Sequence, residues 1–312
     1  MMIFDAHCDT ITKIMERKEN LLENGCHLDI KRMKNFKNYV QCFAAFIDPE
    51  FCQAYAMKRA IQIIDRFYKE IEMNSDRIML CRNYNDILEA EKQGRAGAFL
   101  SIEGGDALQG DISALRVFYR LGVRSLCLTW NHRNEIADGV ADGATGGGIT
   151  PFGRTVIGEM NSLGMVVDVS HISEKGFWDV IEASSQPIVA SHSNAKKLCG
   201  HRRNLSNEQL KALKANGGVT GINFCPAFLN DTDRASLKDI INHIEYIAST
   251  AGIETIGLGS DFDGIEDTPD GVSGVQDIEK VFDELSKLNY SQENIEKIAG
   301  NNFLRIIKQV CS

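Results

Sequence analysis

Short runs of apolar residues, nearly free of charged side chains, recur at intervals along the whole chain. They are rich in Ile, Val, Leu, Ala and Phe, which is typical of parallel strands whose two faces are both covered by other elements. The pattern therefore predicts eight buried strands. The runs cover residues 2–5, 41–47, 96–102, 124–129, 165–169, 187–190, 218–223 and 255–260.

Segments with helical periodicity separate most of these runs. Residues 53–72 repeat apolar side chains at helical spacing, which predicts an amphipathic helix with one buried stripe. That stripe is expected to contain Met57, Ala60, Ile61, Ile64, Phe67 and Ile71. Ser206 and Gln209 have the spacing of a capping box at the start of a helix over 207–216. Further helices are expected at 236–250, 275–288 and 292–310.

The alternation of strands and helices predicts a parallel sheet with right-handed crossovers. Eight strands in 312 residues fit a closed (β/α)8 barrel of the TIM type better than an open sheet. No Pro- or Ser-rich linker divides the chain, so we expect a single catalytic domain over residues 1–312. The Gly-rich stretch 130–152 follows the fourth run and is expected to lie over the mouth of the barrel.

Composition and charge restrict the partners and the compartment. The net charge of −9 argues against a nucleic-acid partner, which normally needs a basic surface. No apolar run has the length of a membrane span, and the chain opens on a predicted strand rather than a signal segment. The nine cysteines contain no Cys-x-x-Cys pair and are expected to be reduced thiols. We therefore expect a cytoplasmic protein without a membrane partner.

Side chains that can bind metals follow four of the predicted strands. His7 and Asp9 end the first run, Glu103 follows the third, and His171 and His192 follow the fifth and sixth. In an extended chain, residues two apart point the same way, so the first pair can reach one ion. Alone, the pair His7 and Asp9 is about as well explained by a structural role, and for Glu103, His171 or His192 alone a solvated or structural role is the better explanation. Their joint occurrence at strand ends, where barrel enzymes place their active sites, predicts a metal site.

The types of ligand narrow the metal and the chemistry. Imidazole and carboxylate without thiolate suit zinc, with Mn, Co or Fe as alternatives. Five protein ligands are too many for one catalytic ion that keeps an open position. Two ions that share one carboxylate, ~3.5–4 Å apart, fit better and would lower the pKa of a bridging water. The set therefore predicts two Zn²⁺ per chain and a hydrolase.

Three further positions are candidates for contact with the substrate or the nucleophile. Asp261 follows the last run closely, where a carboxylate can take a proton from the bridging water. Arg202 and Arg203 are adjacent, and either could bind a substrate carboxylate, although such a pair is more often a solvated loop cluster. His132, on the Gly-rich loop, could polarise a carbonyl oxygen, although a loop histidine is more often incidental.

Several sequence blocks together resemble the membrane (renal) dipeptidase family of zinc dipeptidases, including its soluble bacterial members. The resemblance covers nearly the whole chain. It is carried by Phe4-Asp5-Ala6-His7-Cys8-Asp9, Ser101-Ile102-Glu103-Gly104, Thr150-Pro151-Phe152-Gly153-Arg154, the block from Leu163 to His171, Ser191-His192-Ser193-Asn194-Ala195, Arg202-Arg203-Asn204, and Gly259-Ser260-Asp261-Phe262-Asp263-Gly264.

The resemblance implies a (β/α)8 barrel with a binuclear zinc site and a role for each candidate. One zinc would be held by His7 and Asp9, the other by His171 and His192, and Glu103 would bridge them. Asp261 would transfer the proton, and Arg203 would bind the carboxylate of a dipeptide substrate.

The chain departs from the animal members at one place. Those members have His directly after Thr at the tip of the fourth strand, where it helps to polarise the scissile carbonyl. Here Trp130 follows Thr129, and His132 comes two positions later. We keep the substrate-binding role of His132 as a prediction.

Hydrolysis of free dipeptides, including those with a C-terminal D-residue, is the leading hypothesis for function. The alternative is another binuclear barrel amidohydrolase that acts on cyclic amides or lactones. Such enzymes usually open with His-x-His and often use a carbamylated lysine, whereas no Lys lies between Arg95 and Lys175. A catalytically inactive barrel that serves as a binding protein is disfavoured by the intact ligand set. The oligomeric state, a homodimer included, stays open.

Overall fold

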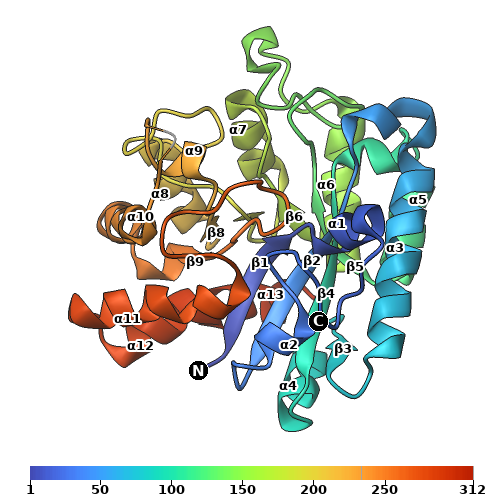
Figure 1. Ribbon diagram of the computed structural model, residues 1–312. Coiled ribbons are helices and arrows are strands. Elements are labelled where there is room, and N and C mark those ends of the chain that lie inside the picture. The colour runs from blue at the N-terminus through green and yellow to red at the C-terminus, as the bar shows by residue number, and fades with distance from the viewer. Residues whose placement is uncertain (233, 312) are drawn as a thin grey trace.

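In the computed structural model, which describes residues 1–232 and 234–311, nine parallel strands form one sheet at the centre of the molecule (Figure 1). Each of the eight predicted runs overlaps one of these strands. The strands are β1 Ile3–Cys8, β2 Tyr39–Phe46, β3 Ile78–Leu80, β4 Ala96–Glu103, β5 Val123–Cys127, β6 Val166–Asp168, β7 Val189–Ala190, β8 Val219–Ile222 and β9 Ile256–Leu258.

The sheet closes on itself because β2 pairs with both β1 and β4. The hydrogen-bonded order runs β2-β1-β9-β8-β7-β6-β5-β4, and the β2–β4 pairing joins its two ends. The predicted (β/α)8 barrel is therefore confirmed, and the carboxyl ends of all eight barrel strands meet at one mouth.

The short strand β3 was not predicted. It pairs with the first half of β4, at Ala96–Ala98, whereas β5 pairs with the second half, from Leu100 to Glu103. β3 therefore covers the edge of β4 that β5 leaves open. Its three residues form too short an apolar run to stand out from the helix that precedes them.

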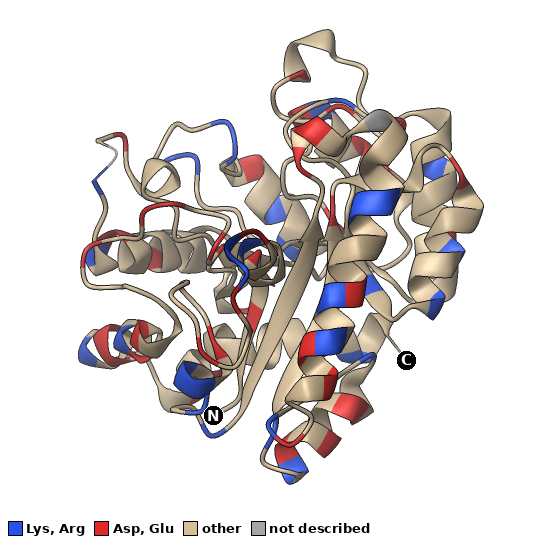
Figure 2. Cartoon of the chain, turned by 45° about the vertical axis from the view of Figure 1, so that its right-hand side comes forward, with Lys and Arg blue, Asp and Glu red and all other residues tan. Residues whose placement is uncertain are grey.

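Helices surround the barrel, and Figure 2 shows Lys, Arg, Asp and Glu positions interspersed along them, whereas the central strands carry few. Within residues 1–232 and 234–311, no helix combines the length and apolar character that crossing a bilayer requires. The helices are α1 Thr10–Arg17, α2 Ile30–Met33, α3 Ala56–Met73, α4 Tyr84–Lys92, α5 Ile112–Arg120, α6 Pro151–Leu163, α7 Glu174–Ala183, α8 Asn207–Ala215, α9 Pro226–Leu229, α10 Leu237–Ala251, α11 Glu279–Lys287, α12 Gln292–Glu296 and α13 Asn302–Val310.

Two helix predictions need correction in detail. In α3 the buried stripe contains Ile63 rather than Ile61, which is 48% exposed, because the packed face follows a period of 3.6 residues from Ala56. The helix predicted over 292–310 is interrupted by a π-helical segment at 297–301. The capping box of α8 is formed as predicted, with Ser206 and Gln209 each bonding the other's backbone.

The end of the barrel where the strands begin is closed by α13. Its Phe303 stacks on Phe4 of β1 with ring centroids 5.5 Å apart. Val166, Val189 and other apolar residues from the beginnings of the strands pack in the same cluster with α13. Because side chains fill that end, an active site is expected at the opposite mouth of the barrel.

Close backbone packing inside the barrel predicts a specific sensitivity to substitution. A Cβ added to Gly259 would overlap the carbonyl oxygen of Ser191. Gly259→Ala is therefore expected to lower the free energy of unfolding by about 1–3 kcal/mol, the usual cost of overpacking. Urea denaturation followed by circular dichroism measures this change.

Gly158, inside α6, is the matched control because a Cβ there would meet nothing within 4 Å. Gly158→Ala is expected to stabilise the protein by roughly 0.4–1 kcal/mol. Equal effects of the two substitutions would contradict the packing described here.

Candidate metal centre and active site

The six residues predicted as metal ligands or proton carrier converge at the mouth of the barrel. His7 is in β1, Glu103 is the last residue of β4, and the others lie one to three residues beyond the ends of β1, β6, β7 and β9. All six are buried, with exposures of 8% or less. Among the described residues, ligand atoms lie close enough for metal binding in three overlapping groups: His7, Asp9 and Glu103; Glu103, His171 and His192; and His7, His192 and Asp261.

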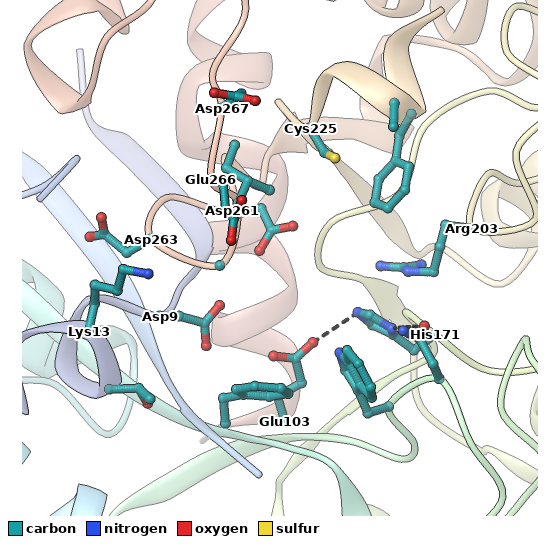
Figure 3. A pocket seen from close by; sticks show the side chains of 18 of the residues that line it. Asp9, Lys13, Glu103, His171, Arg203, Cys225, Asp261, Asp263, Glu266 and Asp267 are labelled. Carbon is teal, nitrogen blue, oxygen red and sulfur yellow. Dashed lines mark hydrogen bonds and ion pairs between the residues drawn. The ribbon is translucent and has the colours of Figure 1, made fainter. Parts of the chain in front are cut away.

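Glu103 lies between two sets of candidate ligands and offers one carboxylate oxygen to each. Its Oε2 is 3.3 Å from Nε2 of His7. Its Oε1 is 2.9 Å from Nε2 of His171 and 3.5 Å from Nε2 of His192. Figure 3 shows Glu103 with Asp9 on one side and His171 on the other. This is the arrangement expected of a carboxylate that bridges two cations.

At two places in the site, buried polar atoms lack the partners that protein atoms normally supply. Within the described part of the chain, Oδ1 of Asp9 has no hydrogen-bond partner, although its Oδ2 lies 3.3 Å from Nε2 of His7. The Nε2 atoms of His171 and His192 face each other at 2.9 Å. Because unsatisfied buried polar atoms are costly, a cation at each place would fit this donor set well.

Asn131 fixes the ring of His171. Its Oδ1 lies 2.9 Å from Nδ1 of His171. An amide oxygen only accepts hydrogen bonds, so Nδ1 carries the proton and the lone pair of Nε2 faces Glu103. Metal-binding histidines are usually held in this way by a second partner.

Burial and mutual charge shift the pKa values of the site in opposite directions. Burial raises the pKa of Asp9 to about 7 against the opposing charge of His7. Burial lowers the pKa of His171 to about 4, aided by the positive charge of Arg203. Burial also lowers the pKa of His192 well below its usual value. His171 and His192 are therefore neutral near pH 7, as metal binding requires.

His7 and Glu103 form the charged pair at the centre of the site. Burial opposes the protonation of His7, but the carboxylates of Glu103 and Asp9 outweigh it and raise its pKa well above the usual value. Burial also opposes the ionisation of Glu103, yet His7, His171 and His192 bring its pKa well below the usual range. His7 and Glu103 therefore carry opposite charges near neutral pH.

Asp261 lies beside this cluster, with Oδ1 3.9 Å from Nε2 of His7. Burial raises its pKa to about 6. The negative charge of Glu103 adds to this rise, and the positive charge of His7 opposes it. Asn223, just beyond the end of β8, donates from Nδ2 to Oδ2 of Asp261 at 2.9 Å. Asp261 is therefore held in place with a pKa close to neutrality, which suits a group that takes and returns a proton.

The two adjacent arginines have different environments. Both line the cavity, but Arg203 is buried and Arg202 is exposed. The Nη1 and Nη2 atoms of Arg203 donate to Oγ of Ser193 and to the carbonyl oxygen of His192. Its Nε is buried and has no partner in the described ranges of the chain. Figure 3 shows its guanidinium group beside His171.

The cavity over the candidate metal ligands has a volume of about 690 Å³, which suits a small ligand. Arg203 lines one side, whereas Asp263, Glu266 and Asp267 line another (Figure 3). Phe228 also lines the cavity, and the centroid of its ring lies 5.6 Å from the guanidinium carbon of Arg203. The candidate ligands therefore face a cavity with both charged and apolar lining residues.

The structure does not bring His132 to this cavity. Its side chain is 70% exposed, and its Nδ1 lies 3.5 Å from Oδ2 of Asp142. Among the described residues that line the cavity, Trp130 and Asn131 are present and His132 is not. The loop turns outward after Asn131, so the geometry does not support the carbonyl-polarising role predicted for His132.

Sequence reasoning missed Asn131, Asn223 and two buried aspartates, Asp5 and Asp168. Both aspartates accept hydrogen bonds from the backbone at the ends of neighbouring strands. A charged residue inside an apolar strand was a visible signal in both places, because such a residue is costly to bury without partners. The two asparagines carried no comparable signal.

The fold and the site together define a metal-dependent hydrolase built on a TIM barrel. The profile of the membrane dipeptidase family, peptidase family M19, matches residues 1–312. The chain belongs to this family. The predicted family assignment is therefore confirmed.

Individual relatives agree with this assignment. The chain is 33% identical over 299 residues to dipeptidase tcpJ of Claviceps purpurea, covering 91% of this chain and 69% of that protein. The structure of dipeptidase AC, a metallopeptidase of family M19, superposes with a TM-score of 0.93 at 26% identity, covering 99% of this chain and 98% of that one. A metallopeptidase from Rhodobacter sphaeroides bound to a phosphinate mimic of L-Ala-D-Ala has a TM-score of 0.91 at 25% identity, covering 99% of both chains.

The raised pKa values of His7 and Asp9 predict that metal binding releases protons. Near neutral pH the metal-free site holds a proton on His7 and, with a pKa of about 7, partly on Asp9. A bound cation needs both groups deprotonated, so its apparent affinity rises with pH until Asp9 is ionised and His7 has lost its proton. Calorimetric titration in two buffers of different ionisation enthalpy measures the number of protons released.

The heats in the two buffers are expected to differ near neutral pH and to converge as the pH rises. Protons from His171 and His192 should contribute little, because both rings are already neutral. Equal heats in both buffers at neutral pH would contradict the protonation states assigned here.

Proposed function

We propose that this protein hydrolyses the peptide bond of free dipeptides at a centre for two divalent cations, which the donor set indicates to be zinc. His7 and Asp9 would hold one ion, His171 and His192 the other, and Glu103 both. The observation that carries this proposal is the placement of Oε1 and Oε2 of Glu103 toward different imidazole groups. When bound, such a pair of ions lowers the pKa of a shared water and polarises the scissile carbonyl.

Asp261 would move the proton during the reaction. It lies beside the cluster, its pKa is about 6, and Asn223 holds one of its oxygens. A carboxylate with these properties can accept a proton from the attacking water and deliver it to the nitrogen of the leaving amine. Oδ1, which lies on the side of the candidate metal ligands, would accept this proton through a free lone pair.

Arg203 would select substrates with a free C-terminal carboxylate. Its buried guanidinium group retains N–H donors that no described residue uses, the Nε–H included. A carboxylate is the natural partner of such a fork. Figure 3 shows Arg203 beside His171, and its charge acts on that ring, so a carboxylate bound there would lie close to the candidate metal centre, which favours dipeptides over longer chains.

A D-residue on the C-terminal side is also part of the proposal. The Rhodobacter sphaeroides relative binds a mimic of L-Ala-D-Ala and covers 99% of this chain. The alternative, hydrolysis of cyclic amides or lactones, has no comparable support. Structural neighbours described as amidohydrolases, one from Pseudomonas aeruginosa with a TM-score of 0.83 included, are 11–24% identical and show a shared fold alone.

Substitution of Asp261 separates metal binding from catalysis. Zinc-loaded wild-type protein is expected to hydrolyse dipeptides from a panel with L and D C-terminal residues. Asp261→Asn keeps the shape of the side chain but removes the base, so kcat should fall about 10²- to 10⁴-fold. Metal content, measured by atomic emission after gel filtration, should stay at two ions per chain.

Asp267→Asn serves as the control, because Asp267 lines the same cavity but is exposed at its rim. Its kcat should stay near that of the wild type. A wild-type protein that binds two zinc ions and hydrolyses no dipeptide of the panel would refute the proposed function.

Removal of the Arg203 guanidinium should affect only substrates with a free C-terminal carboxylate. Arg203→Met is expected to reduce kcat/KM for dipeptides roughly 30-fold or more, because the carboxylate loses its charged partner. That factor corresponds to a loss of about 2 kcal/mol in transition-state stabilisation. The same variant should lose much less on the corresponding dipeptide amides. Arg202→Met, with the exposed neighbour removed, is the control. An equal loss on dipeptides and their amides would show that Arg203 does not bind the carboxylate.

A further inference from the structure

A chain of three buried groups stands behind the ring of His192. Asp168, the last residue of β6, accepts hydrogen bonds from the backbone N–H groups of Ser170 and Ser191, at 2.9 and 3.0 Å. It also accepts one from the hydroxyl of Ser191. Oγ of Ser191 in turn lies 2.7 Å from Nδ1 of His192. Asp168, Ser191 and His192 are all 4% exposed or less.

The hydrogen-bonding capacity of Ser191 decides where the proton of His192 lies. A hydroxyl donates one hydrogen bond and accepts two. The carboxylate of Asp168 takes the single hydroxyl proton, so Oγ must accept from Nδ1 of His192. The ring of His192 is therefore protonated at Nδ1, and the lone pair of Nε2 faces Glu103 and His171.

A second clamp of the same construction lies between β1 and β9 but touches no imidazole that the structure describes. Asp5 accepts hydrogen bonds from the backbone N–H of Ser260 and from its hydroxyl. The residue after this serine is Asp261, and Oγ of Ser260 accepts from the backbone N–H of Phe262 at 3.4 Å. Asp5 also accepts from the backbone N–H of the candidate ligand His7 at 3.3 Å. The two clamps thus tie strand ends in the same way, but among the described residues only that at Ser191 bonds the ring of a candidate metal ligand.

We propose that Asp168 and Ser191 are positioning residues that hold His192 in its Nδ1-protonated form, and that they thereby set the affinity for the cation at His171 and His192. This inference rests on the metal-binding part of the proposed function and is independent of the substrate. A partner of this kind typically changes metal affinity 10- to 100-fold. Without the hydroxyl, the Nδ1–H of His192 loses its acceptor and the ring is free to turn or to change tautomer.

Titration of metal-free protein with Co²⁺, followed by its visible absorption, tests the proposal without any substrate. Ser191→Ala is expected to bind one of two Co²⁺ ions about 10- to 100-fold more weakly and to change the absorption band of that ion. Asp168→Asn, which leaves the hydroxyl in place but weakens its hydrogen bond, should produce a smaller change in the same direction. Ser191→Thr, which restores a hydroxyl, should recover most of the lost affinity.

Ser260→Ala is the matched control, since it removes the same hydroxyl–carboxylate clamp. Its unfolding midpoint in the metal-free state should shift about as much as that of Ser191→Ala, whereas its Co²⁺ affinity at the His171–His192 position should stay near that of the wild type. A twofold or smaller change in Ser191→Ala, or an equal loss in both variants, would overturn the proposal. A lack of dipeptide turnover would instead contradict the proposed function, because the titration measures metal binding alone.

Discussion

The structure depends on the burial of several ionisable groups in one small volume around Glu103. Carboxylates and imidazoles are expensive to remove from water unless opposite charges or metal ions compensate them. Here the described protein atoms compensate these groups only in part, since one oxygen of Asp9 has no partner among them and two imidazole nitrogens face each other at 2.9 Å. Two cations on either side of Glu103 would resolve both conflicts, which supports the proposed binuclear centre.

The barrel holds these ionisable groups together in spite of the cost of burying them. Closure through the β2–β4 pairing brings the ends of distant strands together, and α13 fills the opposite end. Asp5 and Asp168 then tie neighbouring strand ends by accepting backbone N–H groups. The site is thus held by short contacts to rigid strands, and its pKa values follow from that burial.

Much of this could be predicted from the sequence, because the signals were local. Apolar runs revealed the barrel strands, and polar residues directly after those runs predicted the candidate ligands, which the structure brings together. The strand β3 was too short to detect, and the outward path of the loop at His132 depends on tertiary contacts that no local pattern encodes. Asn131 and Asn223 could not be found because an asparagine in a loop is common, and only the folded chain places them beside His171 and Asp261.

Anomalous diffraction from crystals of the zinc-loaded protein, measured on both sides of the zinc absorption edge, tests the central claim most directly. The account predicts two zinc peaks within bonding distance of different oxygens of Glu103. One should contact His7 and Asp9, and the other His171 and His192. A single peak, or two peaks that do not share Glu103, would contradict it.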